Sequence, residues 1–366
     1  MFEITTDTAW QYLREIRRTT MAEPVEVREL AGGVSNAVLL VTGHGGEPFV
    51  LKQARGRLRV KEEWLCPVER IWREVEVLRI CGEVLGTQNS ELRMQKEISA
   101  SVPQVLWEDG ENFLYAMTAA PAGHQTWKEL LLAALKPEAP AKESPSLALQ
   151  ASVCGELLAA LHGGTWNDAA IAAQLDDRSF FDQLRLDPYY RQVARVHLDL
   201  AEPISRLIDS VWQHRRSLVH GDFSPKNLLV WSGHVMLIDF EVGHYGDPAF
   251  DLGFFLTHLV LKSIWAGPRR EEALRLADLF WTAYAAALAS QIPADELADL
   301  EQRMLLNLAG CLLARIDGKS PVDYLNESQQ EIVRHLGCRW LMQPPGDWHS
   351  ARQALLHSGS QWAGAS

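Results

Sequence analysis

The order of apolar and polar residues along the chain predicts a strand-rich first third. Apolar positions recur at helical spacing over residues 8–18, and again from about Pro67 to Cys81, so we expect a helix in each segment. Short apolar runs bounded by glycine- or proline-containing turns predict strands. These runs occupy residues 25–30, 37–41, 48–52, 101–110 and 112–118.

The sequence pattern beyond residue 120 predicts a mainly helical region. Residues 119–123, AAPAG, are the expected linker, and residues 136–146 form a loop rich in proline, alanine and charged residues. We therefore expect an α+β fold with a small β-rich lobe, residues 1–120, followed by a larger helical lobe, residues 121–366. Patterns rich in alanine and leucine predict its long helices at residues 146–162, 190–216, 270–291 and 295–316.

Composition and charge narrow the class of protein. The hydrophobic fraction of 47% and the charged fraction of 22% are those of an ordinary globular protein. A formal net charge of −12 argues against a nucleic-acid partner, because such proteins usually carry a basic face. The sequence lacks both the uncharged apolar run of about 18 residues that spans a membrane and the apolar core of a signal peptide. We expect no membrane partner.

The five cysteines predict a reducing environment. They are widely scattered, odd in number and form no CxxC pair, so we expect neither a disulfide framework nor a zinc site. The expected location is the cytoplasm. The oligomeric state stays open, with a homodimer as one alternative.

The most informative stretch is LVHGDFSPKNLLVWSGHVMLIDFE, residues 218–241. Its two apolar runs flank SGH and predict a β-hairpin centred on Gly233. Asn227 and Asp239 each lie six residues from Gly233, so we expect them to face each other at the open end, with Asp222 in the entering loop. Amide and carboxylate oxygens gathered there suit Mg²⁺. The alternative is that these residues only serve the turns on either side of the hairpin.

The spacing H-G-D-x-x-x-x-N followed by I-D resembles the kinase-like small-molecule phosphotransferases, which include aminoglycoside phosphotransferases, choline kinases and methylthioribose kinases. The resemblance covers about residues 25–260 and implies a protein-kinase-like two-lobed fold. It implies that Asp222 is the catalytic base, and that Asn227 and Asp239 hold Mg²⁺ on the phosphates of ATP. It also implies that His220 and Asp251 support the loop, with Asp251 accepting backbone hydrogen bonds.

The same resemblance implies a nucleotide site in the first lobe. The turn LAGGVSN lies where the family keeps its phosphate-covering loop, which makes Gly32, Gly33, Ser35 and Asn36 candidate phosphate contacts. An ordinary hairpin turn has the same composition, so both interpretations stay open. The hinge that would bind adenine follows the strand NFLYAM and comprises Met117, Thr118 and Ala120.

Lys52 ends the third strand, where the resemblance implies a lysine that contacts the α- and β-phosphates. The family also implies a glutamate on the next helix to pair with it, and the candidates are Glu74 and Glu76. At 100° per residue, Glu74 lies within about 40° of the apolar positions Ile71 and Leu78, whereas Glu76 points away. A glutamate on the apolar face is costly unless paired. We therefore expect Glu74 to be the partner.

The expected activity is ATP-dependent transfer of the γ-phosphate to a hydroxyl of a small molecule, a methylthioribose-like sugar or polyol. Glu241, Arg315 and Lys319 are the candidate substrate contacts, although the two cations also suit the dipole of a helix's last turn. The alternatives are an aminoglycoside O-phosphotransferase and, in another class, a nucleotide-binding pseudokinase. The acceptor, the preference for ATP or GTP and the role of Lys226 stay open.

Overall fold

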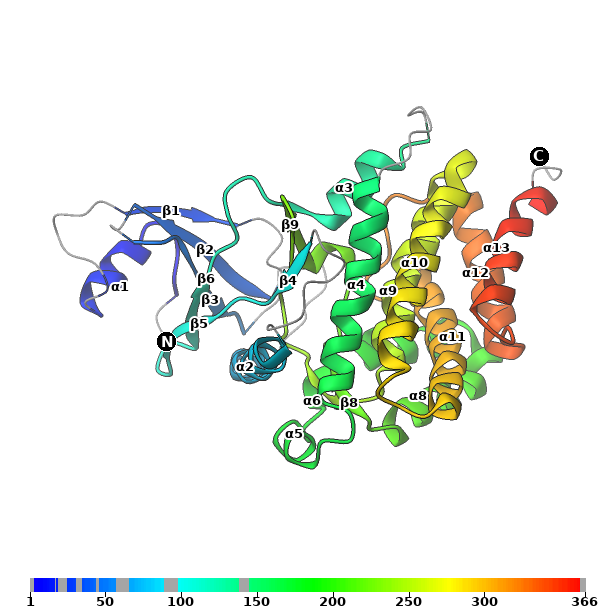
Figure 1. The fold of residues 1–366 in the computed structure, drawn as a ribbon, viewed down its shortest axis with the longest axis horizontal. Coiled ribbons are helices and arrows are strands. Elements are labelled where there is room, and N and C mark those ends of the chain that lie inside the picture. Colours follow the sequence, from blue (N-terminus) through cyan, green and yellow to red (C-terminus); the bar gives the residue numbers. More distant parts are fainter. Residues whose placement is uncertain are drawn as a thin grey trace.

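The chain folds into two lobes that lie side by side in Figure 1, a sheet-based one and a larger helical one. This computed structural model describes residues 3–16, 18, 25–30, 35–43, 46–56, 66–88, 98–137 and 145–362. The expected α+β arrangement is confirmed. Gly32 and Gly33, the predicted phosphate-loop glycines, lie outside the described residues.

The smaller lobe is built on an antiparallel sheet of five strands in the order β1-β2-β3-β6-β5. The central strand β3 is buried on both faces. Leu51 belongs to the core on the side of the first helix, whereas Val50 packs with the second helix. The elements are α1 (Ala9–Glu15), β1 (Glu26–Glu29), β2 (Asn36–Thr42), β3 (Phe49–Ala54), α2 (Arg70–Gln88), β5 (Val105–Asp109) and β6 (Leu114–Thr118), so every strand and helix predicted for this region is present.

A second sheet carries the predicted hairpin between two short strands that the sequence did not indicate. Its order is β4-β10-β9-β7, with β9 (Leu228–Trp231) and β10 (His234–Leu237) forming the hairpin. Strand β4 (Ser99–Ser101) runs parallel to β10, and β7 (Gln125–Thr126) runs antiparallel to β9. Residues on both sides of the linker therefore contribute to this second sheet. The lobe boundary at residue 120 stays a prediction.

The hairpin register differs by one residue from the predicted one. Trp231 pairs with His234, which leaves a two-residue turn, and Asn227 consequently lies opposite Ile238, whose N–H donates to Asn227 O at 3.0 Å. The prediction that Asn227 faces Asp239 across Gly233 is therefore wrong. The reason is the turn: Gly233 adopts a φ of +69°, as tight hairpin turns require, so the centre of the hairpin lies before Gly233.

The larger lobe is helical, with the almost wholly buried α9 at its centre. The single helix predicted over residues 190–216 is wrong. A π-helix (Asp182–Arg191) leads into α7, and the chain then leaves helical geometry at His197, whose side chain contacts Asp317 at 2.8 Å. The other elements are α3 (Trp127–Ala134), α4 (Pro145–Gly164), α5 (Ala169–Gln174), α6 (Ser179–Phe181), α7 (Gln192–Val196), α8 (Ala201–Gln213), β8 (Ser217–Val219), β11 (His244–Gly246), α9 (Ala249–Trp265), α10 (Arg270–Leu288), α11 (Ala294–Asp317), α12 (Glu327–Met342) and α13 (Trp348–Trp362), with 3-10 turns at Leu198–Leu200, Pro225–Asn227 and Gly267–Arg269.

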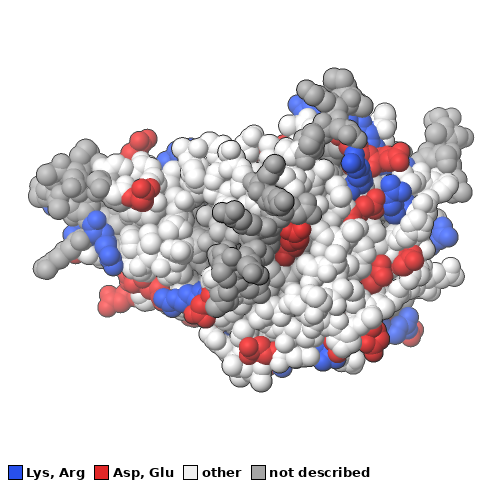
Figure 2. Space-filling model, viewed as in Figure 1, with Lys and Arg blue, Asp and Glu red and all other residues white. Residues whose placement is uncertain are grey.

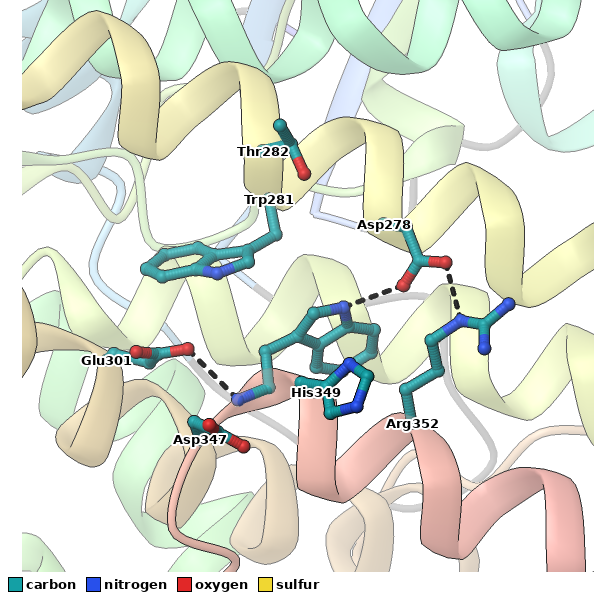
Figure 3. A pocket seen from close by; sticks show the side chains of 8 residues that line it. Asp278, Trp281, Thr282, Glu301, Asp347, His349 and Arg352 are labelled. Carbon is teal, nitrogen blue, oxygen red and sulfur yellow. Dashed lines mark hydrogen bonds and ion pairs between the residues drawn. The ribbon is translucent and has the colours of Figure 1, made fainter.

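The C-terminal helix α13 docks on α10 and α11 through polar contacts (Figure 3). Asp278 of α10 accepts hydrogen bonds from Trp348 Nε1 at 2.9 Å and from Arg352 Nε at 2.5 Å, and Glu301 of α11 accepts from Trp348 N at 2.9 Å. These groups line a cavity of about 460 Å³ together with Trp281. Because its carboxylates hold α13, we assign this cavity a structural role. It lies at the end of the molecule away from the first sheet (Figure 1).

Acidic and basic side chains are interspersed over both lobes on the face shown in Figure 2. Within the described ranges, no helix has both the length and the apolar character that crossing a membrane demands. All five cysteines are free in the structure.

Candidate active site

The loop formed by residues 220–227, which we call the 220–227 loop, is anchored by a buried carboxylate at the start of α9. Asp251 accepts hydrogen bonds from His220 N at 2.6 Å and from Gly221 N at 2.8 Å. These are the backbone hydrogen bonds expected of Asp251. Gly221 has a φ of +76°, and a Cβ there would lie 2.8 Å from the Val242 side chain, so only glycine fits this position.

His220 connects this loop to the hairpin. Its Nδ1 accepts from Asp222 N at 3.0 Å, and its Nε2 lies 3.1 Å from Ile238 O, so the geometry fits a neutral ring that is protonated on Nε2. Burial lowers the pKa of His220 despite the nearby carboxylates, which also favours the neutral form. The side chain therefore orients Asp222 through the backbone.

Three donors converge on a single oxygen of the Asp222 carboxylate. Its Oδ2 lies 3.1 Å from Arg185 Nη2, 2.9 Å from Lys226 Nζ and 2.9 Å from Asn227 Nδ2. Burial would raise the pKa of Asp222, but the charges of Arg185 and Lys226 outweigh it and hold the pKa below its ordinary value. Among the described residues no donor contacts Oδ1. Asp222 therefore presents an ionised carboxylate with one oxygen available to accept a hydroxyl proton.

Lys52 lies between two carboxylates, with Nζ at 2.6 Å from Glu74 Oε1 and 2.7 Å from Asp239 Oδ1. The expected pairing of Lys52 with Glu74 is therefore confirmed, and Glu76 instead contacts Arg73. Burial raises the pKa of Glu74 to about 7 even though Lys52 opposes it. Burial would also raise the pKa of Asp239, but Lys52 and Lys226 hold it well below its ordinary range.

Asp239 adopts a left-handed backbone conformation, with a φ of +74°, immediately after the hairpin. Lys52 holds its Oδ1, and the amide nitrogen of Asn227 is used by Asp222. In the described part of the chain, Asp239 Oδ2 and Asn227 Oδ1 accept no hydrogen bond. The same residues contain no group of three or more His, Cys, Asp or Glu side chains that could hold a metal ion by themselves. Carboxylate and amide oxygens are ligands that Mg²⁺ prefers, so Asp239 Oδ2 and Asn227 Oδ1 would be the groups that hold it.

Glu241 joins the two lobes instead of pointing into an open site. Its carboxylate accepts from Ser35 Oγ at 2.8 Å, Asn36 Nδ2 at 3.0 Å and Arg70 Nε at 3.1 Å. Arg70 is fully buried and also bonds backbone carbonyls of this region, including that of Ser35. The three side chains predicted to contact phosphate or substrate, Ser35, Asn36 and Glu241, thus contact one another here.

The predicted hinge residues lie at the end of β6 and just after it. Met117 and Thr118 end β6, where Met117 pairs with Val50 and is buried. The backbone N–H of Thr118 donates to Gln104 O at 3.0 Å, so that group is already used. Ala120 follows in a segment without regular secondary structure.

The two predicted cationic substrate contacts occupy different surroundings. Arg315 Nη1 donates to Ser320, with Oγ at 3.0 Å, and the side chain is partly buried at the end of α11. Lys319 Nζ lies 3.6 Å from Asp187 in a partly exposed ion pair. Lys319 therefore has an ordinary partner within the protein.

Sequence reasoning did not find Arg185 or Arg70 and left Lys226 unassigned. Arg70 lies one helical turn before Glu74, and that spacing could have placed both on the same buried face. Arg185 comes from the π-helix, for which the sequence carries no pattern. Lys226 lies within the motif, but its pairing with Asp222 depends on the 3-10 turn Pro225–Asn227.

The family model described as "Phosphotransferase enzyme family" matches residues 26–289. The chain is 27% identical to 4-hydroxytryptamine kinase of Psilocybe cyanescens over 257 residues, which covers 64% of this chain and 67% of that protein. It is 35% identical to a methylthioribose kinase of Yersinia pseudotuberculosis over 79 residues, only 19% of either chain. A choline/ethanolamine kinase family protein from Mesorhizobium loti has a TM-score of 0.51 at 16% identity and covers 98% of this chain and 100% of its own. That likeness confirms the kinase-like two-lobed fold.

Proposed function

Because this chain belongs to the phosphotransferase enzyme family, whose members transfer phosphate to hydroxyl groups of small molecules, we propose that it is an ATP- and Mg²⁺-dependent kinase with Asp222 as its catalytic base. The family uses ATP. The acceptor we propose is a hydroxyl of a small sugar or polyol. The free cysteines support a cytoplasmic location.

The observation that supports this function best is the asymmetric environment of the Asp222 carboxylate. Arg185, Lys226 and Asn227 all contact Oδ2, which leaves Oδ1 to orient an acceptor hydroxyl and to receive its proton. The depressed pKa of Asp222 keeps it ionised at neutral pH. A carboxylate in this position would orient the hydroxyl and accept its proton as the phosphoryl group is transferred.

The remaining residues of the site supply charge and position. Asp239 and Asn227 would hold Mg²⁺, which when bound neutralises charge on the phosphates of ATP. Lys52, fixed by Glu74 and Asp239, would contact the nonreacting phosphates, and Lys226 would face the transferred group from the side of Asp222. Phosphoryl transfer depends mainly on such positioning and charge neutralisation.

The test is a coupled assay of ADP release over sugars, polyols, hydroxy acids, amino alcohols, indole alcohols and aminoglycosides. We expect one class to be phosphorylated, and we expect Asp222→Asn to abolish transfer while ATP binding by calorimetry is retained. Equal transfer by Asp222→Asn would remove the base assignment. ATP binding without transfer to any acceptor would instead favour the pseudokinase alternative.

A further inference from the structure

A second group of polar side chains lies on α9, α11 and the segment after α11. Lys262 of α9 is only 1% exposed, which is unusual for a lysine. Its Nζ lies 3.4 Å from His258 O, a weak contact, and 5.7 Å from the centre of the Tyr324 ring. We call Lys262, His258, Arg315 and Tyr324 the basic cluster.

The described residues provide the basic cluster with no carboxylate partner. After burial itself, the charges that act on Lys262 are those of Lys128 and Arg315, and together they lower its pKa to about 7. Burial and then the charges of Lys262 and Arg315 likewise lower the pKa of His258. His258 Nε2, Arg315 Nε and Tyr324 Oη are all buried without a hydrogen-bond partner among these residues.

Such an arrangement is expensive for a folded protein unless something else neutralises it. A buried cation loses its hydration, and like charges nearby add to the cost. Buried donors without acceptors cost further free energy. Groups of this kind occur where a ligand supplies the missing charge and acceptors. The basic cluster therefore has the composition of an anion site.

Aromatic contacts connect the basic cluster to the candidate active site. Arg185, which contacts Asp222 at 3.1 Å, has its Cζ 6.0 Å from the Phe254 ring. That ring lies 5.1 Å from the His258 ring. Lys226, the other cation on Asp222, is close enough to contribute to the lowered pKa of His258. The basic cluster is thus linked to Asp222 through Phe254 and Arg185.

We propose that the basic cluster binds an anionic group of the acceptor, a carboxylate or a phosphate; this inference rests on the proposed function. The substrate is then a negatively charged hydroxyl compound. Lys262 and Arg315 would form charge-assisted hydrogen bonds to it, and His258 and Tyr324 would donate as neutral groups. A polycationic acceptor such as an aminoglycoside would meet like charges here.

The test compares acceptors by charge in the full-length protein, using the ADP-release assay with hydroxy acids, sugar phosphates, neutral polyols and amino alcohols. We expect turnover of hydroxy acids or of sugar phosphates, and the class that reacts identifies the anion. Lys262→Met should raise the KM for that acceptor about tenfold or more and leave the KM for ATP unchanged. Lys136→Met, which removes the same charge from an exposed position, should change neither value.

Turnover of only neutral or cationic acceptors, or an unchanged acceptor KM in Lys262→Met, would overturn this inference and leave the kinase function standing. If the panel gives no turnover, malonate and inorganic phosphate serve as probes of binding alone. We expect each to raise the Tm of the wild type more than that of Lys262→Met. Equal shifts in the two proteins would overturn the anion site, whereas the absence of turnover bears on the proposed function.

Discussion

Replacing Lys262 with methionine is expected to raise the Tm of the protein, because it removes a buried ammonium that no carboxylate of the described residues neutralises. Methionine has a similar length and fills the same space. The groups that face the ammonium are His258 on its own helix, Arg315 of α11, Lys128 of α3 and Tyr324. The substitution therefore relieves repulsion, and it removes one weak hydrogen bond and the contact with the Tyr324 ring.

The size of the effect follows from the shift in pKa. The pKa of Lys262 falls from 10.5 to about 7 in the folded protein. The unfolded chain binds this proton more tightly, so the penalty is complete below pH 7 and declines as the pH rises from 7 toward 10.5. At 1.36 kcal/mol per unit of pKa, it is about 5 kcal/mol near pH 6 and about 2 kcal/mol near pH 9. For a chain of this length, about 5 kcal/mol corresponds to about 6 °C in Tm.

The assay is thermal unfolding between about pH 6 and pH 9 in buffers without phosphate or carboxylates, because such anions would themselves stabilise the wild type. Lys262→Met should melt about 6 °C above the wild type near pH 6, and the gap should shrink to about 2–3 °C near pH 9. Lys136→Met is the charge-matched control and should follow the wild type. A Lys262→Met protein that melts at or below the wild type near pH 6, or a gap independent of pH, would refute the reasoning.

Three further predictions concern buried and partly buried carboxylates. Asp239→Ala should weaken Mg²⁺-dependent ATP binding about tenfold or more, measured by calorimetry with and without Mg²⁺, and an unchanged affinity would remove the metal assignment. Asp251→Asn replaces an acceptor of two backbone N–H groups, so the free energy of unfolding measured with urea should fall by about 1–3 kcal/mol. The kcat should also fall more than the affinity for ATP, and an unchanged kcat would contradict the positioning role of Asp251. Asp278→Ala breaks the bonds to Trp348 and Arg352 and should lower the Tm by about 2 °C without changing kcat; a lower kcat would show that this docking reaches the active site.

The local elements and the order of the motifs were accessible from the sequence because they depend on near neighbours. Helical spacing alone distinguished Glu74 from Glu76, and the contact with Lys52 agrees with that choice. Strand patterns in the first lobe were strong because its central strands are buried on both faces, so their sequences are short apolar runs bounded by turns. The hairpin was also evident, but its register depended on a turn conformation that composition does not determine.

Long-range contacts were not accessible in the same way. Ser35 and Glu241 are separated by 206 positions, and their hydrogen bond exists because Arg70 brings the two segments together. Arg185 contacts Asp222 from a π-helix, a geometry that leaves no period in the sequence. Lys262 lies within an apolar helix, where a single lysine is usually placed at the surface by default. These residues could be assigned only after the chain was folded.

The second sheet, β4-β10-β9-β7, also determines how the protein can be divided. Strand β4 comes before the linker and covers the edge of β10, whereas β7 follows the linker and covers the edge of β9. A fragment that begins at residue 121 would leave the edge of β10 unpaired beside the candidate active site, and exposed edges promote aggregation. The lobes are therefore not interchangeable modules, and any split or transplanted version of the catalytic half has to keep residues 98–126 with it.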